Sequence, residues 1–310
     1  MSAGFEDPRR VLARHGFTPK RSFSQNFLIS ERVVRAIVEA CALTPERDVV
    51  ELGPGCGTLT LALAQVCRRV YAVERDPDML QVLEAEADPA RVELVRGDAK
   101  QVDLRALGGG SPITVAGNLP YAITGAILRH LVEQSALVQH AVLMVQREVR
   151  DRMIAAPDTS EYGALTVFTC QVFDVHTVTQ VPRTAFHPPP KVTSSVVRLV
   201  PRAEPRAPRI PAFERVVRAA FQARRKTLRN ALVQQLGAEL SDQILGAASS
   251  SSASTPAVRR SRSRNLGCSP ARWNAHRADC SEGAAFQQKG GLPGVEPHFT
   301  RRLHGLGERP

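Results

Sequence analysis

The chain lacks any apolar run approaching the roughly 18 residues that a membrane-spanning helix needs. Its first residues, MSAGFEDPRRVLARHGF, also lack the apolar core of a signal peptide, and Glu6 and Asp7 occur early. These absences argue against a membrane protein and against an exported or organelle-targeted one. We therefore expect a cytoplasmic protein.

Paired cysteines are also missing, because none of the six cysteines forms a C-x-x-C pair. Cys268, Cys280 and His276 lie near one another in the sequence, but without a recognised spacing of zinc ligands. We expect no metal site and no disulfide framework. We interpret the other four cysteines as small buried residues of a reducing compartment: Cys41, Cys56, Cys67 and Cys170.

Most of the chain lacks a strong excess of charge of one sign, although the net charge of the whole chain is +11. Residues 247–310 hold 10 Lys and Arg against 4 Asp and Glu, whereas residues 1–246 hold 31 against 26. More than half of the excess therefore lies in the last segment. The remaining charge is too small to establish a polyanionic partner by itself.

Apolar strands alternate with helical patterns from about residue 49 to residue 156. This order predicts an α/β fold, with a mostly parallel sheet and helices on both faces. Two later segments, 172–182 and 192–201, read as strands that could pair antiparallel. Helical spacing returns after the Pro- and Arg-rich segment 201–211.

We expect three parts: a Rossmann-like domain over 1–204, an incomplete helical domain over 205–246, and a low-complexity, disordered tail over 247–310. The tail begins abruptly with GAASSSSASTPAVRRSRSRN, inside a helical region that looks unfinished. A shifted reading frame would produce such a change. A functional basic tail is the alternative.

The segment ELGPGCG follows the first strand of this pattern, and its glycines allow a tight turn close to a ligand. Gly53 and Gly55 are the candidate contacts. Glu74 ends the next strand, where a carboxylate can accept both hydroxyls of a ribose, and Asp98 follows the third strand near an adenine amine. NAD would also fit a carboxylate there, but the glycine spacing is compressed relative to G-x-G-x-x-G. The acidic surroundings favour S-adenosylmethionine.

The segment VAGNLPY ends a fourth strand with an amide, a proline and an aromatic ring. An adenine N6 amine is a poor nucleophile, and acceptors for its two N–H groups would activate it. Asn118 can accept one, and the main-chain carbonyl of Leu119 or Pro120 the other. Tyr121 can stack on the base. The alternative is a strand-ending turn with a tyrosine in the core.

Six segments together resemble the rRNA adenine N6,N6-dimethyltransferase family over about residues 9–236. They are SFSQNFL, ELGPGCGTL, GDA, AGNLPY, EYGALTV and FHPPPKVTSSVV. The resemblance implies a Rossmann-like methyltransferase domain, a small helical domain and S-adenosylmethionine as the cofactor. Within the family, the chain is most similar to the branch that dimethylates two adjacent adenines near the 3′ end of 16S rRNA during small-subunit maturation.

By the same resemblance, Asn26 and Leu28 form part of the cofactor lid, and Phe186 places a second ring against the target base. The other cofactor contacts would be Gly53, Glu74, Asp98 and Asn118. The chain departs from the family at Ala164, where a basic residue is common, and beyond residue 246, where the helical domain should continue.

Basic residues that could contact RNA phosphates are concentrated in QARRKTLRN, with a few more beside the expected pocket. The alternative is a solvated helix face. The target adenine should be single-stranded or flipped out. We expect RNA binding by the following residues: Lys20, Arg21, Lys191, Arg224, Arg225, Lys226 and Arg229.

We predict a monomeric enzyme acting on 16S rRNA in the immature small ribosomal subunit. A 23S rRNA methyltransferase of the macrolide-resistance type is one alternative, although NLPY favours the 16S branch over the NIPY usual in the other. A small-molecule or DNA N6 methyltransferase is a second. An assembly factor with lost or secondary catalysis is a third.

Overall fold

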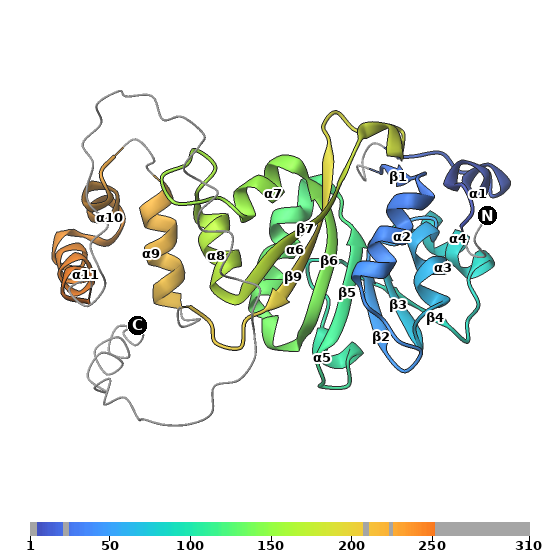
Figure 1. The fold of residues 1–310 in the computed structure, drawn as a ribbon, viewed down its shortest axis with the longest axis horizontal. Helices are drawn as coiled ribbons and strands as arrows, with labels where there is room; N and C mark the ends of the chain where they lie inside the picture. The colour runs from blue at the N-terminus through green and yellow to red at the C-terminus, as the bar shows by residue number, and fades with distance from the viewer. Residues whose placement is uncertain (1–4, 21–24, 207–210, 223–225, 252–310) are drawn as a thin grey trace, which may run out of the picture. The chain divides into compact units, whose positions relative to one another are not determined.

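The computed structural model describes residues 5–20, 25–206, 211–222 and 226–251 of the chain. The chain divides into two compact units, Met1–Phe221 and Gln222–Pro310. None of the described helices is long and apolar enough to cross a membrane. The first unit contains every described strand (Figure 1).

The core of the first unit is a seven-stranded sheet in the order β4-β3-β2-β5-β6-β9-β7. Its first five strands in this order are parallel, and β9 pairs antiparallel with both β6 and β7. The strands are β2 (Asp48–Leu52), β3 (Arg69–Glu74), β4 (Val92–Arg96), β5 (Ile113–Asn118), β6 (Val138–Gln146), β7 (Phe173–Val181) and β9 (Ser194–Pro201). The expected α/β fold with a mostly parallel sheet is confirmed.

The central strands are apolar on both faces, as strands covered on both sides by helices must be. In β2, for example, Val49 and Val50 are both 0% exposed but belong to different core clusters. One cluster includes Ile37 from α2 (Glu31–Ala40) and Leu63 from α3 (Thr58–Ala64), and the other includes Leu128 from α6 (Thr124–Glu133). Alternation along the strand therefore sends successive side chains into two separate cores.

Helices of the first unit cover these faces (Figure 1). Those before and among the first strands are α1 (Pro8–Arg14), α2 (Glu31–Ala40), α3 (Thr58–Ala64) and α4 (Pro77–Glu86). Those that follow are α5 (Leu104–Leu107), α6 (Thr124–Glu133), α7 (Arg147–Met153) and α8 (Ala164–Val172), with the 3-10 turns η2 (Tyr121–Ile123), η3 (Ser135–Leu137) and η4 (Arg183–Ala185). The short strand-to-helix turns place the amino ends of α3 and α4 beside the carboxyl ends of β2 and β3.

A second sheet consists of two very short antiparallel strands, β1 (Phe27–Leu28) and β8 (Phe186–His187). Phe27 pairs with His187, and Leu28 pairs with Phe186. This pair ties the segment before α2 to the loop between β7 and β9. Strands of two residues show no periodicity, so no pattern in the sequence predicts them.

The helix α9 (Pro211–Gln222) belongs to the first unit except for its last residue. The ring of Phe213 lies edge-on to Phe168 of α8, with centroids 6.2 Å apart, and the guanidinium of Arg218 lies over the Phe168 ring. Through these contacts with Phe168, α9 packs on the first unit. The unit boundary therefore follows Phe221, whereas we expected it after residue 204.

The described part of the second unit is a pair of helices, α10 (Leu228–Leu236) and α11 (Ala238–Ser251). The Thr227 side chain caps α10 by accepting from the Asn230 amide, and Gly237, with a φ of 84°, connects the two helices. The expected start of the disordered tail at residue 247 falls inside α11, which continues to Ser251. The rest of the tail lies outside the described residues.

Candidate active site

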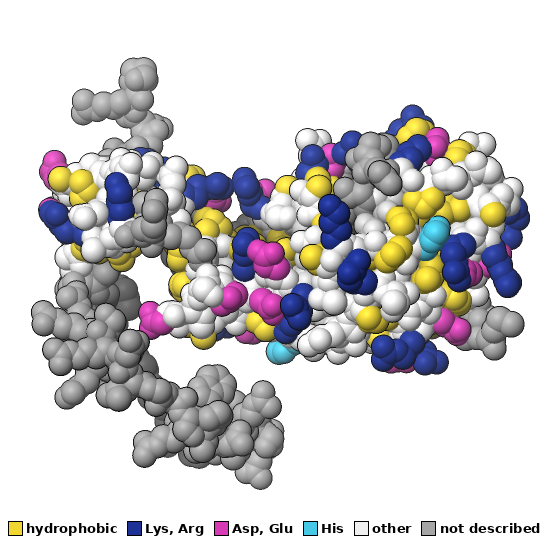
Figure 2. All heavy atoms as spheres, turned by 90° about the horizontal axis from the view of Figure 1, so that it is seen from above, with side chains coloured by type: hydrophobic (Ala, Val, Ile, Leu, Met, Phe, Trp, Pro, Cys, Tyr) yellow, Lys and Arg dark blue, Asp and Glu magenta, His cyan; other side chains and the backbone are white. Residues whose placement is uncertain are grey.

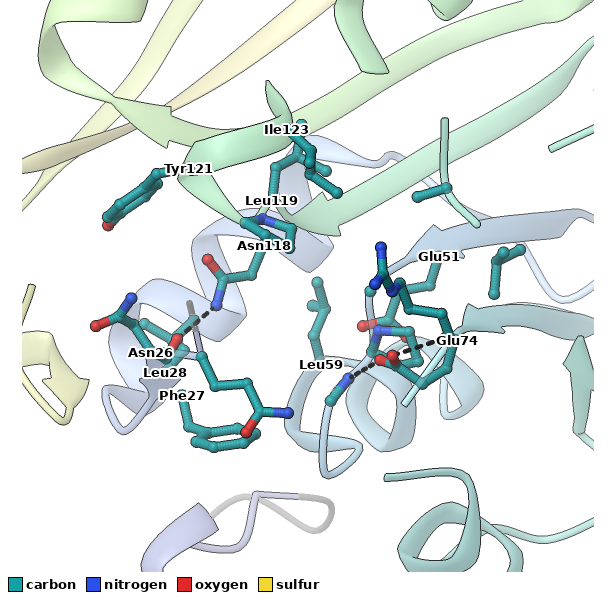
Figure 3. A pocket seen from close by; sticks show the side chains of 18 of the residues that line it. Asn26, Phe27, Leu28, Glu51, Leu59, Glu74, Asn118, Leu119, Tyr121 and Ile123 are labelled. Carbon is teal, nitrogen blue, oxygen red and sulfur yellow. Dashed lines mark hydrogen bonds between the residues drawn. The ribbon is translucent and has the colours of Figure 1, made fainter. Parts of the chain in front are cut away.

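A cavity opens at the carboxyl edge of the parallel strands, where the fold rule for open α/β sheets places ligands. Its walls come from the loops after β2, β3, β4 and β5 and from the segment before α2 (Figure 3). It brings together every residue predicted for the cofactor: Asn26, Leu28, Gly53, Gly55, Glu74, Asp98 and Asn118. Leu119, Pro120 and Tyr121 also line it.

The glycine loop after β2 is tied to the Glu74 carboxylate. Oε2 of Glu74 accepts from the Gly55 amide at 3.1 Å, while Oε1 accepts from the amides of Arg75 and Asp76 at 2.8 and 2.9 Å. Gly55 has a φ of 58°, and a Cβ there would lie 3.0 Å from the Phe27 ring. Three of about four acceptor positions of the carboxylate are therefore occupied, which leaves one for a ligand hydroxyl in this conformation.

Burial raises the pKa of Glu74, against the opposing effect of these amide hydrogen bonds. Asp98 behaves differently, because it is only half-buried. Its partial burial is outweighed by the Lys100 amide, which donates to Oδ1 at 3.0 Å, and by the charges of Lys100 and Arg75. The pKa of Asp98 is therefore lowered, and Asp98 presents an ionised carboxylate to the cavity.

The side chain of Asn118 has a fixed orientation. Its Nδ2 donates to the main-chain oxygen of Asn26 at 3.0 Å (Figure 3). Because the amide nitrogen is used in this way, Oδ1 is the atom left to accept a hydrogen bond. Asn118 lies in the cavity at the end of β5, so a bound amine can meet an acceptor there.

The two candidate carbonyls next to Asn118 differ in availability. The Pro120 oxygen already accepts from the Ile123 amide and from Oγ1 of Thr124, both at 3.1 Å. Both of its lone pairs are thus used within the η2 turn. Among the described residues, no hydrogen bond to the Leu119 oxygen is present. Of the two alternatives, Leu119 is therefore the main-chain acceptor that remains open.

Tyr121 is anchored through its hydroxyl, which lies 2.6 Å from Oγ of Ser194 at the start of β9. Ser194 is 0% exposed, so this hydrogen bond is shielded from water. Burial raises the pKa of Tyr121, and the bond to Ser194 opposes the shift in part. The hydroxyl is neutral and engaged, which leaves the ring as the part of Tyr121 that can meet a ligand.

The cavity also contains a carboxyl oxygen without a partner. Oε2 of Glu51 is buried and has no hydrogen-bond partner among the described residues, and the residue is 1% exposed. Burial raises the pKa of Glu51 to about 8; the Thr60 hydroxyl opposes the shift and the Glu74 charge adds to it. An unmatched carboxyl group beside a glycine loop in which a Cβ on Gly55 would lie 3.0 Å from the Phe27 ring suits a ligand with hydroxyls and positive charge. The residues present thus fit S-adenosylmethionine.

Phe186, expected to lie against the target base, does not line the cavity. Its ring is 2% exposed and packs in the core cluster that contains Leu28 and Val196. Pairing of β8 with β1 holds it there. In this conformation the ring stabilises the cavity wall and offers no surface to a base.

The predicted RNA-binding residues have several different surroundings. Lys20 is bound by Asp76 and Asp78, at 2.8 and 2.5 Å, and Arg229 is paired with Asp242. Lys226 donates to Gln234, and Lys191 is exposed in the loop before β9. Three further members of the predicted set, Arg21, Arg224 and Arg225, lie outside the described residues.

Sequence reasoning missed several residues that support the site. Asp76 is 0% exposed; it caps α4, and its carboxylate also accepts from Lys20 and from Gln25. Gly117 packs so closely on β2 that a Cβ would lie 2.6 Å from the Leu52 oxygen. An N-cap aspartate before Pro77 was visible as a local signal. The contacts of Gly117 and Gln25 join segments distant in the sequence and leave no local trace.

Comparison with known proteins agrees with this geometry. The family model described as ribosomal RNA adenine dimethylase matches residues 16–249. A ribosomal RNA small subunit methyltransferase A of Myxococcus xanthus is 48% identical over 229 residues, covering 73% of this chain and 81% of that protein.

Two solved structures are similar as well. A dimethyladenosine transferase from Plasmodium falciparum has a TM-score of 0.60 at 25% identity, covering 76% of this chain and 84% of the other. The 23S rRNA methyltransferase ErmE has a TM-score of 0.53 at 29% identity, covering 72% and 90%. The family match extends over most of the chain and includes the loops that build the cavity. The chain is thus a member of the ribosomal RNA adenine dimethylase family.

Proposed function

We propose that this chain dimethylates the N6 amines of two adjacent adenines near the 3′ end of 16S rRNA in the immature small ribosomal subunit. S-adenosylmethionine would be the cofactor, and the protein would work as a monomer in the cytoplasm. The observation that carries the proposal is a pair of open acceptors at the end of β5, Oδ1 of Asn118 and the oxygen of Leu119.

These acceptors match an exocyclic amine, which has two N–H groups in one plane. Accepting from both concentrates electron density on the nitrogen, and the acceptors gain strength as the nitrogen becomes positive during methyl transfer. Asn118 does not need to act as a base, because an amide oxygen accepts without taking the proton, and the methylated nitrogen would lose its proton to solvent after the transfer. The Tyr121 ring, held by Ser194, provides a flat surface on which the base can stack.

The cofactor would lie along the sheet edge in the order of the strands. Asp98 after β4 would take the adenine end, Glu74 at the end of β3 a ribose hydroxyl, and Asn26 and Leu28 would cover it. When bound, S-adenosylmethionine supplies a methyl group activated by a positively charged sulfur. The chain's own part is to hold the acceptors of Asn118 and Leu119 beside that methyl group and to exclude water.

The small-subunit relatives favour 16S over 23S rRNA as the substrate. The Myxococcus protein named for the small subunit is 48% identical, whereas the ErmE structure, named for 23S rRNA, is 29% identical. The NLPY segment agrees with this choice. A 23S rRNA methyltransferase remains the second candidate because ErmE shares the fold of the catalytic unit.

Transfer of labelled methyl groups from S-adenosylmethionine decides between the two. The substrates are small subunits that lack the modification, large subunits and free rRNA, and the modified base is mapped afterwards. We expect dimethyladenosine at two adjacent positions near the 3′ end of 16S rRNA. Modification of 23S rRNA alone would replace the proposal by its alternative, and no transfer to any rRNA would reject both.

RNA contacts outside the cavity are proposed for the basic segment around Lys226. Figure 2 shows the described Lys and Arg side chains spread over the visible face and interspersed with hydrophobic ones. The logarithm of the RNA-binding constant falls linearly with the logarithm of the salt concentration. Replacing Arg224, Arg225 and Lys226 by alanine should make this slope shallower by about one unit per lost phosphate contact. The double variant Arg35→Ala/Glu39→Ala, an exposed pair on α2, is the control. An equal slope in both proteins would reject these contacts.

A further inference from the structure

The carboxyl group of Glu51 has no role in the proposed transfer, yet it occupies a costly position. It lies in the cavity wall near the end of β2, 1% exposed, with Oε2 buried and unpartnered among the described residues. A buried acceptor without a partner keeps the full penalty of its lost hydration. A bound ligand that offers a donor or a positive charge at this point would remove that penalty.

The surroundings of Glu51 favour its neutral form. Glu74 faces it from β3 and adds to the rise of its pKa, whereas the Thr60 hydroxyl on α3, itself without a hydrogen-bond partner among the described residues, opposes that rise. Figure 3 shows both carboxyl groups across the cavity from Asn118 and Tyr121. The neighbouring groups also include the thiols of Cys41 and Cys56; burial raises their pKa values to about 12 and about 11, so both remain neutral.

Among the described residues that line the same cavity, Arg75 is a cation, and its guanidinium lies 3.7 Å from the Asp98 carboxylate. It therefore helps to balance Asp98, which is ionised. With burial on one side and the Glu74 charge on the other, Glu51 carries a proton at neutral pH.

The strand order places Glu51 where the cofactor is positive. Asp98 follows β4, Glu74 ends β3, Glu51 lies on β2, and Asn118 ends β5, which is the order of these strands across the sheet. With adenine and ribose at the first two strands, the sulfur and amino-acid part of the ligand falls at the next two. Both positive charges of S-adenosylmethionine belong to that part.

We propose that Glu51 recognises the positive charge of the bound cofactor, and that it loses its proton to solvent as the cofactor binds. The step is an acid dissociation: the O–H bond of the carboxyl group breaks, the proton goes to buffer, and the carboxylate pairs with the ligand's cation. It rests on the proposed cofactor. The ligand itself provides the charge that stabilises the carboxylate.

The consequence is measurable as a proton count. Without ligand the carboxyl group titrates with a pKa of about 8, so at pH 6.5 it is almost fully protonated. Pairing with a cation lowers the pKa, and binding then releases close to ~1 proton per site. Affinity should rise by up to about tenfold per pH unit from pH 6.5 towards pH 8; above that it levels off if the sulfonium is recognised, and falls if the ammonium is, because the ammonium loses its proton there. At pH 6.5 an α-amino group, with a pKa of about 7.7–8.0, is already charged and contributes little.

Calorimetric titration of the full chain with S-adenosylmethionine at pH 6.5, in two buffers of different ionisation enthalpy, gives the count. We expect release in the wild type and none in Glu51→Gln, whose affinity should depend much less on pH. S-adenosylhomocysteine shows which positive group of the ligand pairs with Glu51. Proton release with both ligands assigns the pairing to the ammonium that they share, and proton release with S-adenosylmethionine alone assigns it to the sulfonium. Both results support the proposal.

Binding without proton release, or equal release in the wild type and Glu51→Gln, would overturn it; the second result would show that the proton comes from a group other than Glu51. If Glu51→Gln does not fold, infrared difference spectra of the wild type replace it. The band of a protonated carboxyl group must disappear when the cofactor is added, and its persistence rejects the proposal. The binding heat itself tests the proposed cofactor separately, so failure of the one is distinguishable from failure of the other.

Discussion

The side-chain nitrogen Nδ2 of Asn118 donates a hydrogen bond of 3.0 Å to the main-chain oxygen of Asn26, which lies 92 positions away in the sequence. One hydrogen bond thus joins the end of β5 to the segment that covers the cavity. It also decides which atom of the Asn118 side chain is left for a substrate.

Replacing Asn118 by alanine should reduce methyl transfer by about 10²–10³-fold, because a preorganised acceptor for the reacting amine is lost. The measurement is single-turnover methylation of small subunits at saturating cofactor, so that weaker binding does not appear as slow chemistry. Gln81→Ala, which removes an exposed amide on α4 outside the cavity, is the control and should keep the wild-type rate. A wild-type rate for Asn118→Ala would reduce this amide to a turn residue.

Tyr121 allows a test that separates ring from hydroxyl. Tyr121→Ala should lose the stacking surface, worth about 1–3 kcal/mol, whereas Tyr121→Phe keeps it. Tyr121→Phe and Ser194→Ala should each lower stability modestly, because each leaves a hydroxyl unmatched at the 2.6 Å contact.

The double variant Tyr121→Phe/Ser194→Ala should be less destabilised than the sum of the two single variants, because it removes both hydroxyls. Denaturant unfolding and single-turnover rates give both readouts. If Tyr121→Phe is as inactive as Tyr121→Ala, the hydroxyl takes part in the chemistry and the stacking assignment is wrong.

Gly117 should tolerate no side chain. A Cβ would lie 2.6 Å from the Leu52 oxygen, so Gly117→Ala must push β5 away from β2 beside the site. We expect a loss of about 1–3 kcal/mol of stability, measured by thermal or denaturant unfolding. Gly125→Ala on α6 is a matched control, because a Cβ there meets nothing within 4 Å, and it should be neutral or stabilising. Equal stability of the two variants would contradict the close approach.

The buried acid should also give folding a pH dependence. Burial raises the pKa of Glu51 to about 8, so between the ordinary carboxyl pKa and pH 8 the folded chain binds a proton that the unfolded chain has lost. Stability therefore falls as pH rises through this window, by up to about 1.4 kcal/mol per pH unit from this group, and levels off above it.

Unfolding free energies at pH 5.5, 6.5 and 7.5 measure the slope. Glu51→Gln should reduce it, although Glu74, whose pKa burial also raises, acts in the same direction. Glu93→Gln, which changes an exposed glutamate paired with Arg69, should leave the slope as in the wild type. An unchanged slope in Glu51→Gln would show that another group carries the linkage.

Strand ends were the part of the site that the sequence could predict. Glu74 and Asn118 close apolar segments whose length and flanking turns mark them as buried strands, and parallel strands bring their carboxyl ends to one edge. Asn26 and Leu28 needed the family resemblance, because their contacts with β5 and β8 are distant in sequence. The partners of Lys20 were unpredictable for the same reason: its ion pairs with Asp76 and Asp78 depend on how the first segment crosses α4.

Phe186 shows a different limit. An aromatic residue before three prolines is compatible with an exposed ring and with a packed one, and the choice depends on whether β1 lies across from it. The unit boundary has a similar cause. A linker composition after residue 201 suggested a domain change, whereas the ring contact of Phe213 with Phe168 decides that α9 packs on the first unit.

The pair formed by β1 and β8 has a consequence for the order in which the molecule opens. It closes a loop from Phe27 to His187, which carries a large closure entropy, and each of its strands has only two residues. Few bonds therefore resist its local opening, while β5 stays protected in the middle of seven strands. The Ile29 amide, bonded to the Ala185 oxygen at 2.8 Å, should exchange with deuterium sooner than the amides of β5. We therefore expect the segment that covers the cavity to open while the sheet remains intact.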